Sequence, residues 1–228
     1  MFNVIIPLRS GSKGLKNKNI STFGNESLVN CLLNKITNIR DINKIYILTD
    51  SKSYKQKIKK HKKVDLSYHR PKRLSLDNSN IYDLVSHFIK WESEKENKIK
   101  NILLLQVTSP LLNKKEIEKT ILFIKKKKIK SLFHVCEMIE NPNDCIKGYN
   151  KNWSFLSKKI KVNRQNYDKY YFITGSLYFF TKNFFLKYKK FYKKKSIAYK
   201  VDKINFIDID TNFDLALAKA VENLKIRN

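Results

Sequence analysis

The chain has 228 residues, of which 42% are hydrophobic and 12% aromatic, so it can bury a core and is not a disordered protein. Its formal net charge is +28, carried by 42 lysines and only six arginines. The three cysteines and four histidines lack the spacing of a zinc site or a disulfide framework. No apolar run reaches the roughly 18 residues of a membrane span, and no secretory signal is evident, so we expect a cytoplasmic protein without a membrane partner.

The positive charge has two interpretations. A basic chain can be a nucleic-acid-binding module, but such modules typically use arginine at base edges and regularly placed aromatic rings. Here lysine replaces arginine almost throughout, and runs such as Lys125–Lys128 are typical of a solvated face encoded by A+T-rich codons. We therefore expect no nucleic-acid partner, and a binding module remains the less favoured alternative.

Short apolar runs alternate with amphipathic stretches, which predicts a mostly parallel, mixed sheet flanked by helices. The expected strands are Val4–Leu8, Lys44–Leu48, Ile102–Leu105, Ser131–Val135, Phe172–Phe180 and Ile204–Ile209. Core-facing helical stripes are expected at Ile81, Leu84, Val85 and Phe88, at Ile117, Ile121 and Ile124, and at Phe213, Leu217, Ala220 and Leu224. No linker is visible, so we predict a single domain over residues 1–228, in which residues of about 137–172 form a lobe outside the sheet for dimerisation or sugar binding.

The loop after the first expected strand has the composition of an anion site. Residues 7–19 contain two of the five glycines together with Arg9, Lys13 and Lys18. Glycine permits a tight backbone with inward-facing N–H groups, and the cations supply the charge that a nucleoside triphosphate needs. Neither a Walker A pattern nor a dinucleotide-binding glycine pattern is present. The alternative is a lysine-rich surface turn.

Two aspartates near the carboxyl terminus predict a metal site. In an extended segment, Asp208 and Asp210 share one face while Ile207 and Ile209 share the other. Two converging carboxylates repel each other unless a cation lies between them, and Mg²⁺ prefers such oxygen ligands. The alternative is a pair of surface or helix-capping aspartates, because a helix is expected to begin next to them.

Seven sequence blocks together resemble the acylneuraminate cytidylyltransferases, the CMP-sialic acid synthetases. In chain order they are IPLRSGSKGLKNKNI, TDS at 49–51, RPKRLSLD at 70–77, QVTSPL at 106–111, NRQ at 163–165, TGSLY at 174–178 and IDID at 207–210. The resemblance covers nearly the whole chain. It implies a Rossmann-like nucleotide-diphospho-sugar transferase fold, a homodimer, and transfer of CMP from CTP to the anomeric hydroxyl of a nonulosonic acid, with release of pyrophosphate.

The resemblance also implies roles for particular residues. Expected nucleotide contacts are Leu8, Arg9, Lys13, Lys18, Asn19, Arg70, Asp77 and Ser79. Expected sugar contacts are Gln106, Thr108, Arg164, Gln165, Thr174 and Tyr178. Asp208 and Asp210 would bind Mg²⁺, and with Arg9 and Lys18 they are the candidate catalytic residues.

Three departures from the family pattern are expected on the acceptor side. Leu112 stands where the family has arginine, Thr174 replaces asparagine, and Phe172 replaces a sugar-binding arginine of one branch. The sequence therefore does not distinguish among N-acetylneuraminic, legionaminic and other nonulosonic acids as the acceptor. A KDO-type or other sugar, or another nucleoside triphosphate, is the alternative within enzymes.

Overall fold

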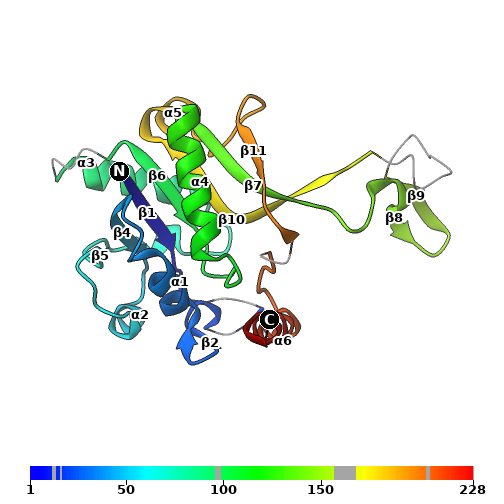
Figure 1. The fold of residues 1–228 in the computed structure, drawn as a ribbon, viewed down its shortest axis with the longest axis horizontal. Helices are drawn as coiled ribbons and strands as arrows, with labels where there is room; N and C mark the ends of the chain where they lie inside the picture. The colour runs from blue at the N-terminus through cyan, green and yellow to red at the C-terminus, as the bar shows by residue number, and fades with distance from the viewer. Residues whose placement is uncertain (12–13, 16, 96–98, 157–167, 204–205, 228) are drawn as a thin grey trace.

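A computed structural model describes residues 1–11, 14–15, 17–95, 99–156, 168–203 and 206–227, without the side chains of 225–227. Its main sheet has seven strands in the order β11-β7-β10-β6-β1-β4-β5 (Figure 1). The bounds are β1 Phe2–Pro7, β4 Ile42–Leu48, β5 Val64–Asp65, β6 Asn101–Leu105, β7 Ser131–Glu137, β10 Tyr171–Thr181 and β11 Ile197–Lys200. Strand β10 is antiparallel to both its neighbours, β6 and β7, and the other pairs in this sheet are parallel. The predicted mostly parallel, mixed α/β fold is confirmed.

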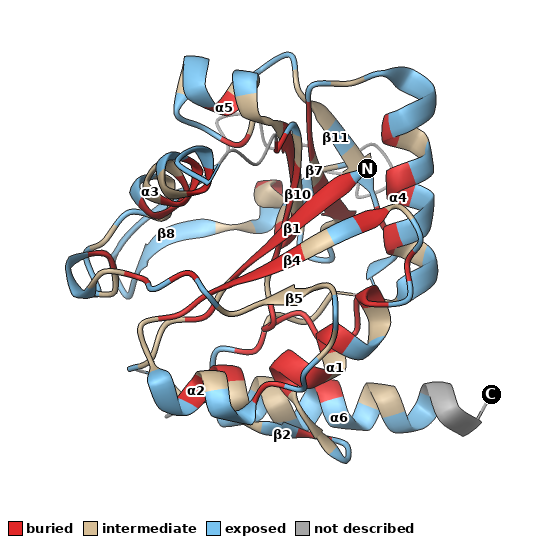
Figure 2. Cartoon of the chain, turned by 90° about the vertical axis from the view of Figure 1, so that its left-hand side faces the viewer, coloured by how far each residue is buried: buried red, intermediate tan, exposed pale blue. Residues whose placement is uncertain are grey.

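Helices cover both faces of this sheet (Figure 2). Their bounds are α1 Leu28–Ile36, α2 Lys52–Lys57, α3 Ile81–Ser93, α4 Lys114–Lys127, α5 Lys182–Tyr188 and α6 Asn212–Arg227. Strand β1 supplies both cores: Val4 and Ile6 belong to the cluster that includes α1 and α4, and Ile5 belongs to the cluster that includes α3 and α5. The central strands are therefore apolar on both faces, as expected for a parallel sheet covered by helices.

Two predicted features are wrong. Residues 206–209, the described part of the strand expected at Ile204–Ile209, form no strand, and the edge strand is β11 instead. The predicted stripe on α6 is also exposed, with Phe213 at 74% and Leu224 at 60%, because α6 packs through Leu215, Ala218 and Val221. Both stripes have helical spacing, and periodicity alone does not tell which one meets the core.

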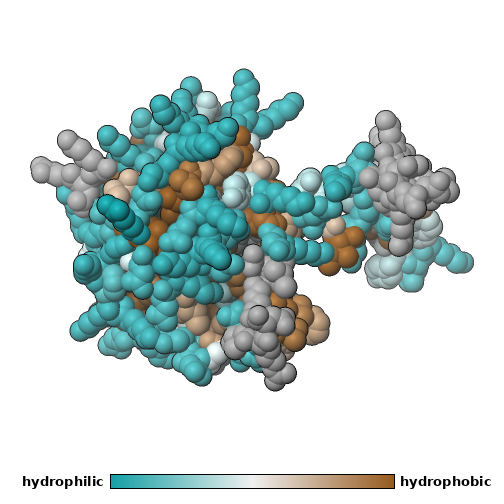
Figure 3. Space-filling model, viewed as in Figure 1, coloured by the Kyte–Doolittle hydropathy of each residue, from teal (hydrophilic) through white to brown (hydrophobic). Residues whose placement is uncertain are grey.

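A two-stranded ribbon projects away from the body (Figures 1 and 3). It pairs β8 (Ile146–Tyr149) with β9 (Asn152–Phe155), and every residue of both strands is exposed. A second small pair, β2 (Thr22–Phe23) with β3 (Glu26–Ser27), precedes α1. In the described part of the chain, no helix has the length and apolar character of a membrane span.

Candidate nucleotide-binding site

A polar pocket of about 580 Å³ lies beside the carboxyl ends of β1 and β6. Ligands of open α/β sheets bind at this edge, where loops from neighbouring strands converge. The pocket is lined by nine of the expected site residues, namely Arg9, Lys18, Asn19, Arg70, Asp77, Ser79, Gln106, Thr108 and Asp210. It is also lined by Pro7, Gly14, Leu76, Ile81 and Thr211. Segments up to about 200 residues apart in the sequence thus share one cavity.

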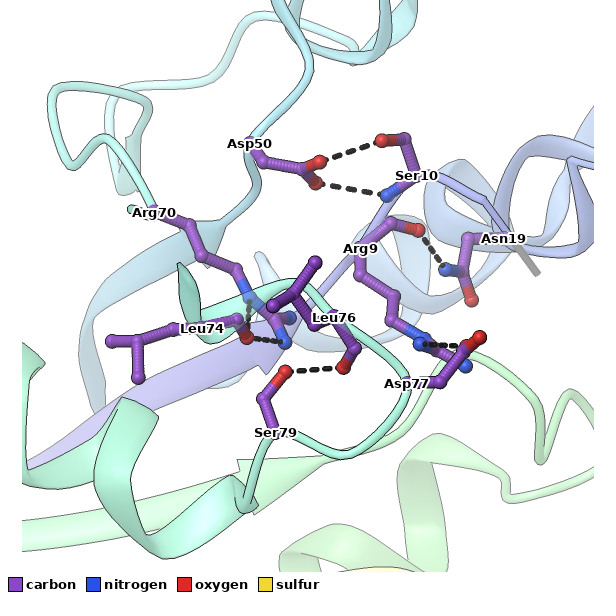
Figure 4. A network of polar contacts seen from close by, with 9 residues as sticks. All are labelled: Arg9, Ser10, Asn19, Asp50, Arg70, Leu74, Leu76, Asp77 and Ser79. Carbon is purple, nitrogen blue, oxygen red and sulfur yellow. Dashed lines mark hydrogen bonds and ion pairs between the residues drawn. The ribbon is translucent and has the colours of Figure 1, made fainter. Parts of the chain in front are cut away.

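The loop after β1 is held by its own polar contacts. The Asn19 side-chain amide donates to the Arg9 carbonyl oxygen at 2.9 Å, and Asn19 is itself buried in a short 3₁₀ helix, Lys18–Ile20 (Figure 4). Gly11 turns the chain with a φ of +78°, a conformation that side chains other than glycine rarely adopt. Asn19 therefore contributes to the site by fixing the backbone that carries Arg9.

Two cations of the pocket are paired with carboxylates of the pocket. Arg9 Nη1 lies 2.8 Å from Asp77 Oδ1, and Lys18 Nζ lies 2.7 Å from Asp210 Oδ1. The first pair is drawn in Figure 4. All four side chains are partly exposed, so water screens both pairs and each contributes little to stability. An incoming polyanion can replace these carboxylates at modest cost.

Arg70 is the buried cation of the site. It is only 6% exposed, and its Nε and Nη2 both donate to the Leu74 carbonyl oxygen (Figure 4). Burial lowers the pKa of the Arg70 guanidinium. Nearby, the Ser79 hydroxyl donates to the Leu76 carbonyl oxygen, which closes the turn that leads into α3. Arg70 thus lines the pocket as a fixed planar donor.

Asp208 and Asp210 sit in different surroundings. Asp210 is exposed and paired with Lys18, whereas Asp208 is half-buried and its Oδ1 has no hydrogen-bond partner among the described residues. The pKa of the Asp208 carboxyl is raised overall. Burial and the charge of Asp210 raise it, and a hydrogen bond from Thr108 offsets part of that increase. The segment is anchored by Ile209, whose N–H donates to the Thr108 carbonyl oxygen at 2.8 Å.

The donor set fits Mg²⁺. An unpartnered, buried carboxylate oxygen next to a second carboxylate suits a hard cation, which takes one or two protein carboxylates and completes its shell with water and phosphate oxygens. No group of three or more histidine, cysteine or acidic side chains poised for a metal occurs among the described residues. A site here would therefore need substrate and water as its remaining ligands.

Four other expected site residues that the structure describes do not line this pocket, namely Leu8, Thr174, Tyr178 and Asp208. Leu8 is fully buried, and its N–H donates to the Leu48 carbonyl oxygen. Thr174 is buried, with its hydroxyl 2.8 Å from Ser176 Oγ, and Tyr178 packs on Phe191 and Tyr192. Burial raises the pKa of Tyr178 to about 12. Lys13, Arg164 and Gln165 lie outside the described residues.

None of the three departures expected on the acceptor side lines the pocket. Leu112 is 2% exposed and belongs to the core, so its replacement of arginine changes packing and not a pocket wall. Phe172 is half-exposed and contacts Phe206, with ring centroids 5.6 Å apart. Neither side chain lines the polar pocket.

Sequence reasoning assigned no role to two residues that the structure brings to the site. Thr211 lines the pocket, and its hydroxyl and N–H donate to Asp214 Oδ2, which also accepts from the Asp210 N–H. Asp50 holds the loop after β1 through Ser10. The sequence block TDS, at the end of β4, could have pointed to Asp50. The pattern Thr211-x-x-Asp214, which is the signature of a helix capping box, could have pointed to Thr211.

The fold and pocket define an α/β protein in which a cationic, glycine-containing loop and Asp210 line one cavity. A family model described as cytidylyltransferase matches residues 3–226, and the chain belongs to this family. N-acylneuraminate cytidylyltransferase of Escherichia coli is 28% identical over 98% of this chain and 52% of its own length. The corresponding protein of Streptococcus agalactiae serotype III is 27% identical over 92% of this chain and 50% of its own length. The chain therefore spans about half the length of these curated relatives, and the resemblance seen in the sequence blocks is confirmed at the level of the family.

Two solved structures share the fold. CMP:2-keto-3-deoxy-manno-octonic acid synthetase complexed with CTP superposes with a TM-score of 0.70, at 12% identity, covering 98% of this chain and 99% of that chain. 4-Diphosphocytidyl-2C-methyl-D-erythritol synthase from Anaerococcus prevotii gives a TM-score of 0.62, at 16% identity, covering 97% and 98%. At these identities the likeness establishes the architecture alone.

Proposed function

We propose that the chain transfers CMP from CTP to the anomeric hydroxyl of a nonulosonic acid of the sialic or legionaminic type and releases pyrophosphate. The observation that carries the proposal is the single pocket in which the loop after β1 and Asp210 meet, in a chain of the cytidylyltransferase family. The named activity of the relatives at 26–28% identity supports the acceptor class. The KDO-type acceptor of a solved neighbour is the second candidate, supported by the shared fold.

In this proposal Arg9 and Lys18 bind the triphosphate of CTP. A cation about 4 Å from a phosphate oxygen gains on the order of 4 kcal/mol at an effective dielectric constant near 20, before the cost of desolvation. Phosphates on these side chains would displace the carboxylates of Asp77 and Asp210, which hold them in the free protein. Arg70, fixed by Leu74, also lines the pocket and would donate to the nucleotide.

The reaction is an in-line displacement at the α-phosphorus, in which positioning and charge neutralisation provide most of the rate enhancement. Gln106 and Thr108, at the end of β6, would orient the sugar acid toward that phosphorus. Asp208 and Asp210 would hold Mg²⁺, which when bound would neutralise phosphate charge and lower the pKa of the attacking hydroxyl. Burial raises the pKa of the Asp208 carboxyl, and a cation bound to it would favour the ionised form.

We also propose that the β8–β9 ribbon pairs two copies of the chain. Its exposed apolar side chains include Tyr149 at 78% and Trp153 at 49%, on strands that contribute nothing to the two cores. Large exposed apolar side chains grouped on one projection are typical of an association surface. Because every residue of both strands is exposed within one chain, both faces of the ribbon are open to a partner.

A pyrophosphate-release assay tests the proposed function. The chain is incubated with Mg²⁺, one of the four common nucleoside triphosphates, and a panel of N-acetylneuraminic, legionaminic and KDO-type acids. We expect release with CTP and a nonulosonic acid. Release only with a KDO-type acid would transfer the assignment to that acceptor. Release with GTP or UTP but not CTP would contradict the nucleotide assignment, and retention on RNA without any release would favour a nucleic-acid-binding module.

A further inference from the structure

Asp50 connects the end of β4 to the loop after β1. Its Oδ1 accepts the Ser10 N–H at 2.9 Å, and its Oδ2 accepts the Ser10 hydroxyl at 2.6 Å (Figure 4). Ser10 directly follows Arg9, and the two hydrogen bonds fix both its backbone and its side chain. One carboxylate therefore sets where the loop leaves the sheet.

The same carboxylate lies near the buried Arg70. Its charge raises the pKa of Arg70, against the lowering by burial, and Arg70 in turn lowers the pKa of Asp50. The Arg70 side chain donates to a neutral carbonyl, that of Leu74, and no ion pair joins Arg70 to a carboxylate of the described residues. The Arg70 N–H donates to the Thr49 carbonyl oxygen at 3.1 Å, which places Arg70 beside the end of β4.

Asp50 is negatively charged at neutral pH. Burial raises the pKa of its carboxyl, but the two hydrogen bonds from Ser10, the Asp50 backbone N–H and the charge of Arg70 together leave the pKa below its ordinary value. The negatively charged Asp50 carboxylate thus lies close to the segment that carries Arg9 and to Arg70, two cations that line the pocket. Asp50 itself is not among the residues that line it. Its contacts with the site run through Ser10, by two hydrogen bonds, and its charge acts on Arg70.

We propose that Asp50 is a positioning residue for the phosphates of the nucleotide. It positions Arg9 through its hydrogen bonds to Ser10, and it positions Arg70 through its charge. The proposal rests on the proposed function, because it takes the ligand to be CTP. Without the Asp50 carboxylate, the Ser10 N–H and hydroxyl lose their acceptor, which favours other conformations of the loop after β1. Arg70 loses a counter-charge, which weakens the hold on its buried side chain.

The first test is ligand binding by calorimetry in the presence of Mg²⁺, with CTP and CMP as probes. For Asp50→Ala we expect the Kd of CTP to rise about tenfold or more, since a hydrogen-bonded charge is removed, and the Kd of CMP to change much less because CMP lacks the β- and γ-phosphates. Asp50→Asn and Ser10→Ala should give smaller effects in the same direction, and they serve if Asp50→Ala does not fold.

Asp65 provides a matched control. Its Oδ1 accepts both the N–H and the hydroxyl of Ser67, as the carboxylate of Asp50 does from Ser10, and its Oδ2 also pairs with Lys44. Asp65 lies on β5, and neither Asp65 nor these two partners adjoin a residue that lines the pocket. Asp65→Ala should leave the Kd values of CTP and CMP unchanged. An equal loss of CTP affinity in Asp65→Ala and Asp50→Ala, or wild-type affinity in Asp50→Ala, would overturn the positioning role.

The second test needs no ligand. Amide hydrogen exchange of the peptide that covers residues 8–11 should be faster in Asp50→Ala than in the wild type, while the peptides of α4 exchange at the same rate. If the wild type itself does not bind CTP, the proposed function fails, and exchange still decides whether Asp50 holds the loop. Unchanged exchange at residues 8–11 would overturn the proposal even if CTP binds.

Discussion

Gly14 lies directly against the backbone of Asp210, so a Cβ atom on Gly14 would come within 2.5 Å of the Asp210 carbonyl oxygen. Real Cβ atoms do not approach a backbone oxygen so closely, and neither partner is the flexible end of a side chain. The loop after β1 and the segment that carries the two aspartates therefore meet only because residue 14 has no side chain.

Gly14→Ala should separate the two halves of the pocket. We expect kcat/KM for CTP to fall about 100-fold or more, as found when binding groups are displaced by about 1 Å, while the melting temperature changes by only a few degrees. Gly24→Asn is the control, since Gly24 has a positive φ but a Cβ placed there would meet no atom within 4 Å. Equal activity of the two variants would show that the contact has no role.

Asp208→Asn and Asp210→Asn should each lower kcat about 100-fold or more, the scale seen when one electrostatic group of an active site is removed. Circular dichroism and melting temperature should stay close to wild type. Glu118→Gln removes a carboxylate from an exposed ion pair on α4 and should leave kcat unchanged. Near-normal turnover of both aspartate variants would remove the metal assignment.

Two lysine–aspartate pairs of equal length allow a direct comparison. Lys18 lies 2.7 Å from Asp210 at the pocket, and Lys125 lies 2.7 Å from Asp41 on the surface. We expect Lys18→Gln to raise the KM of CTP about tenfold, the size of a lost charge-assisted contact, and Lys125→Gln to have no effect. A similar change in both variants would indicate that Lys18 acts only through the net charge.

His134 should make the fold sensitive to acid. The ring is fully buried, its Nε2 lies 2.9 Å from Thr120 Oγ1, and burial lowers its pKa to about 3. Below pH 6.5 the unfolded chain takes up a proton that the folded chain does not, so the free energy of unfolding falls as pH drops and is fully retained above pH 6.5.

The loss is about 1.4 kcal/mol for each pH unit below 6.5. In urea titrations between pH 7.5 and 5.0, His134→Gln should lose less stability than the wild type, and the exposed His69→Gln should follow the wild type. Parallel curves for the wild type and His134→Gln would refute the interpretation.

The β8–β9 ribbon should determine the oligomeric state of the protein in solution. We expect the wild type to be a dimer by light scattering and Trp153→Asp to be a monomer, because a charge replaces an aromatic ring at the association surface. Leu122→Asp changes a side chain that is 65% exposed on α4, away from the ribbon, and should remain a dimer. A monomeric wild type would contradict the proposed pairing.

The local pattern of apolar and polar residues was sufficient to predict the central strands of this protein. Continuous apolar runs such as Val4–Leu8 and Ile102–Leu105 predicted β1 and β6 to within about two residues, since only strands covered on both faces are apolar at every position. The order of the sequence blocks also indicated the family. Nine of the expected site residues line one pocket, and three of them, Arg9, Gln106 and Thr108, were placed by the pattern itself, because they closely follow β1 and β6, whose ends lie at the same edge.

Other features depend on distances between residues far apart in the sequence. Which apolar stripe of α6 meets the core, why Leu112 is buried and why residues 206–209 form no strand are decided by neighbours that periodicity does not contain. The contact of Gly14 with Asp210 and the hold of Asp50 on Ser10 likewise join separate segments. Residue order thus determined the strands, the family and the chemistry available, whereas tertiary packing decided which of those groups share a cavity, since that depends on close approach through space.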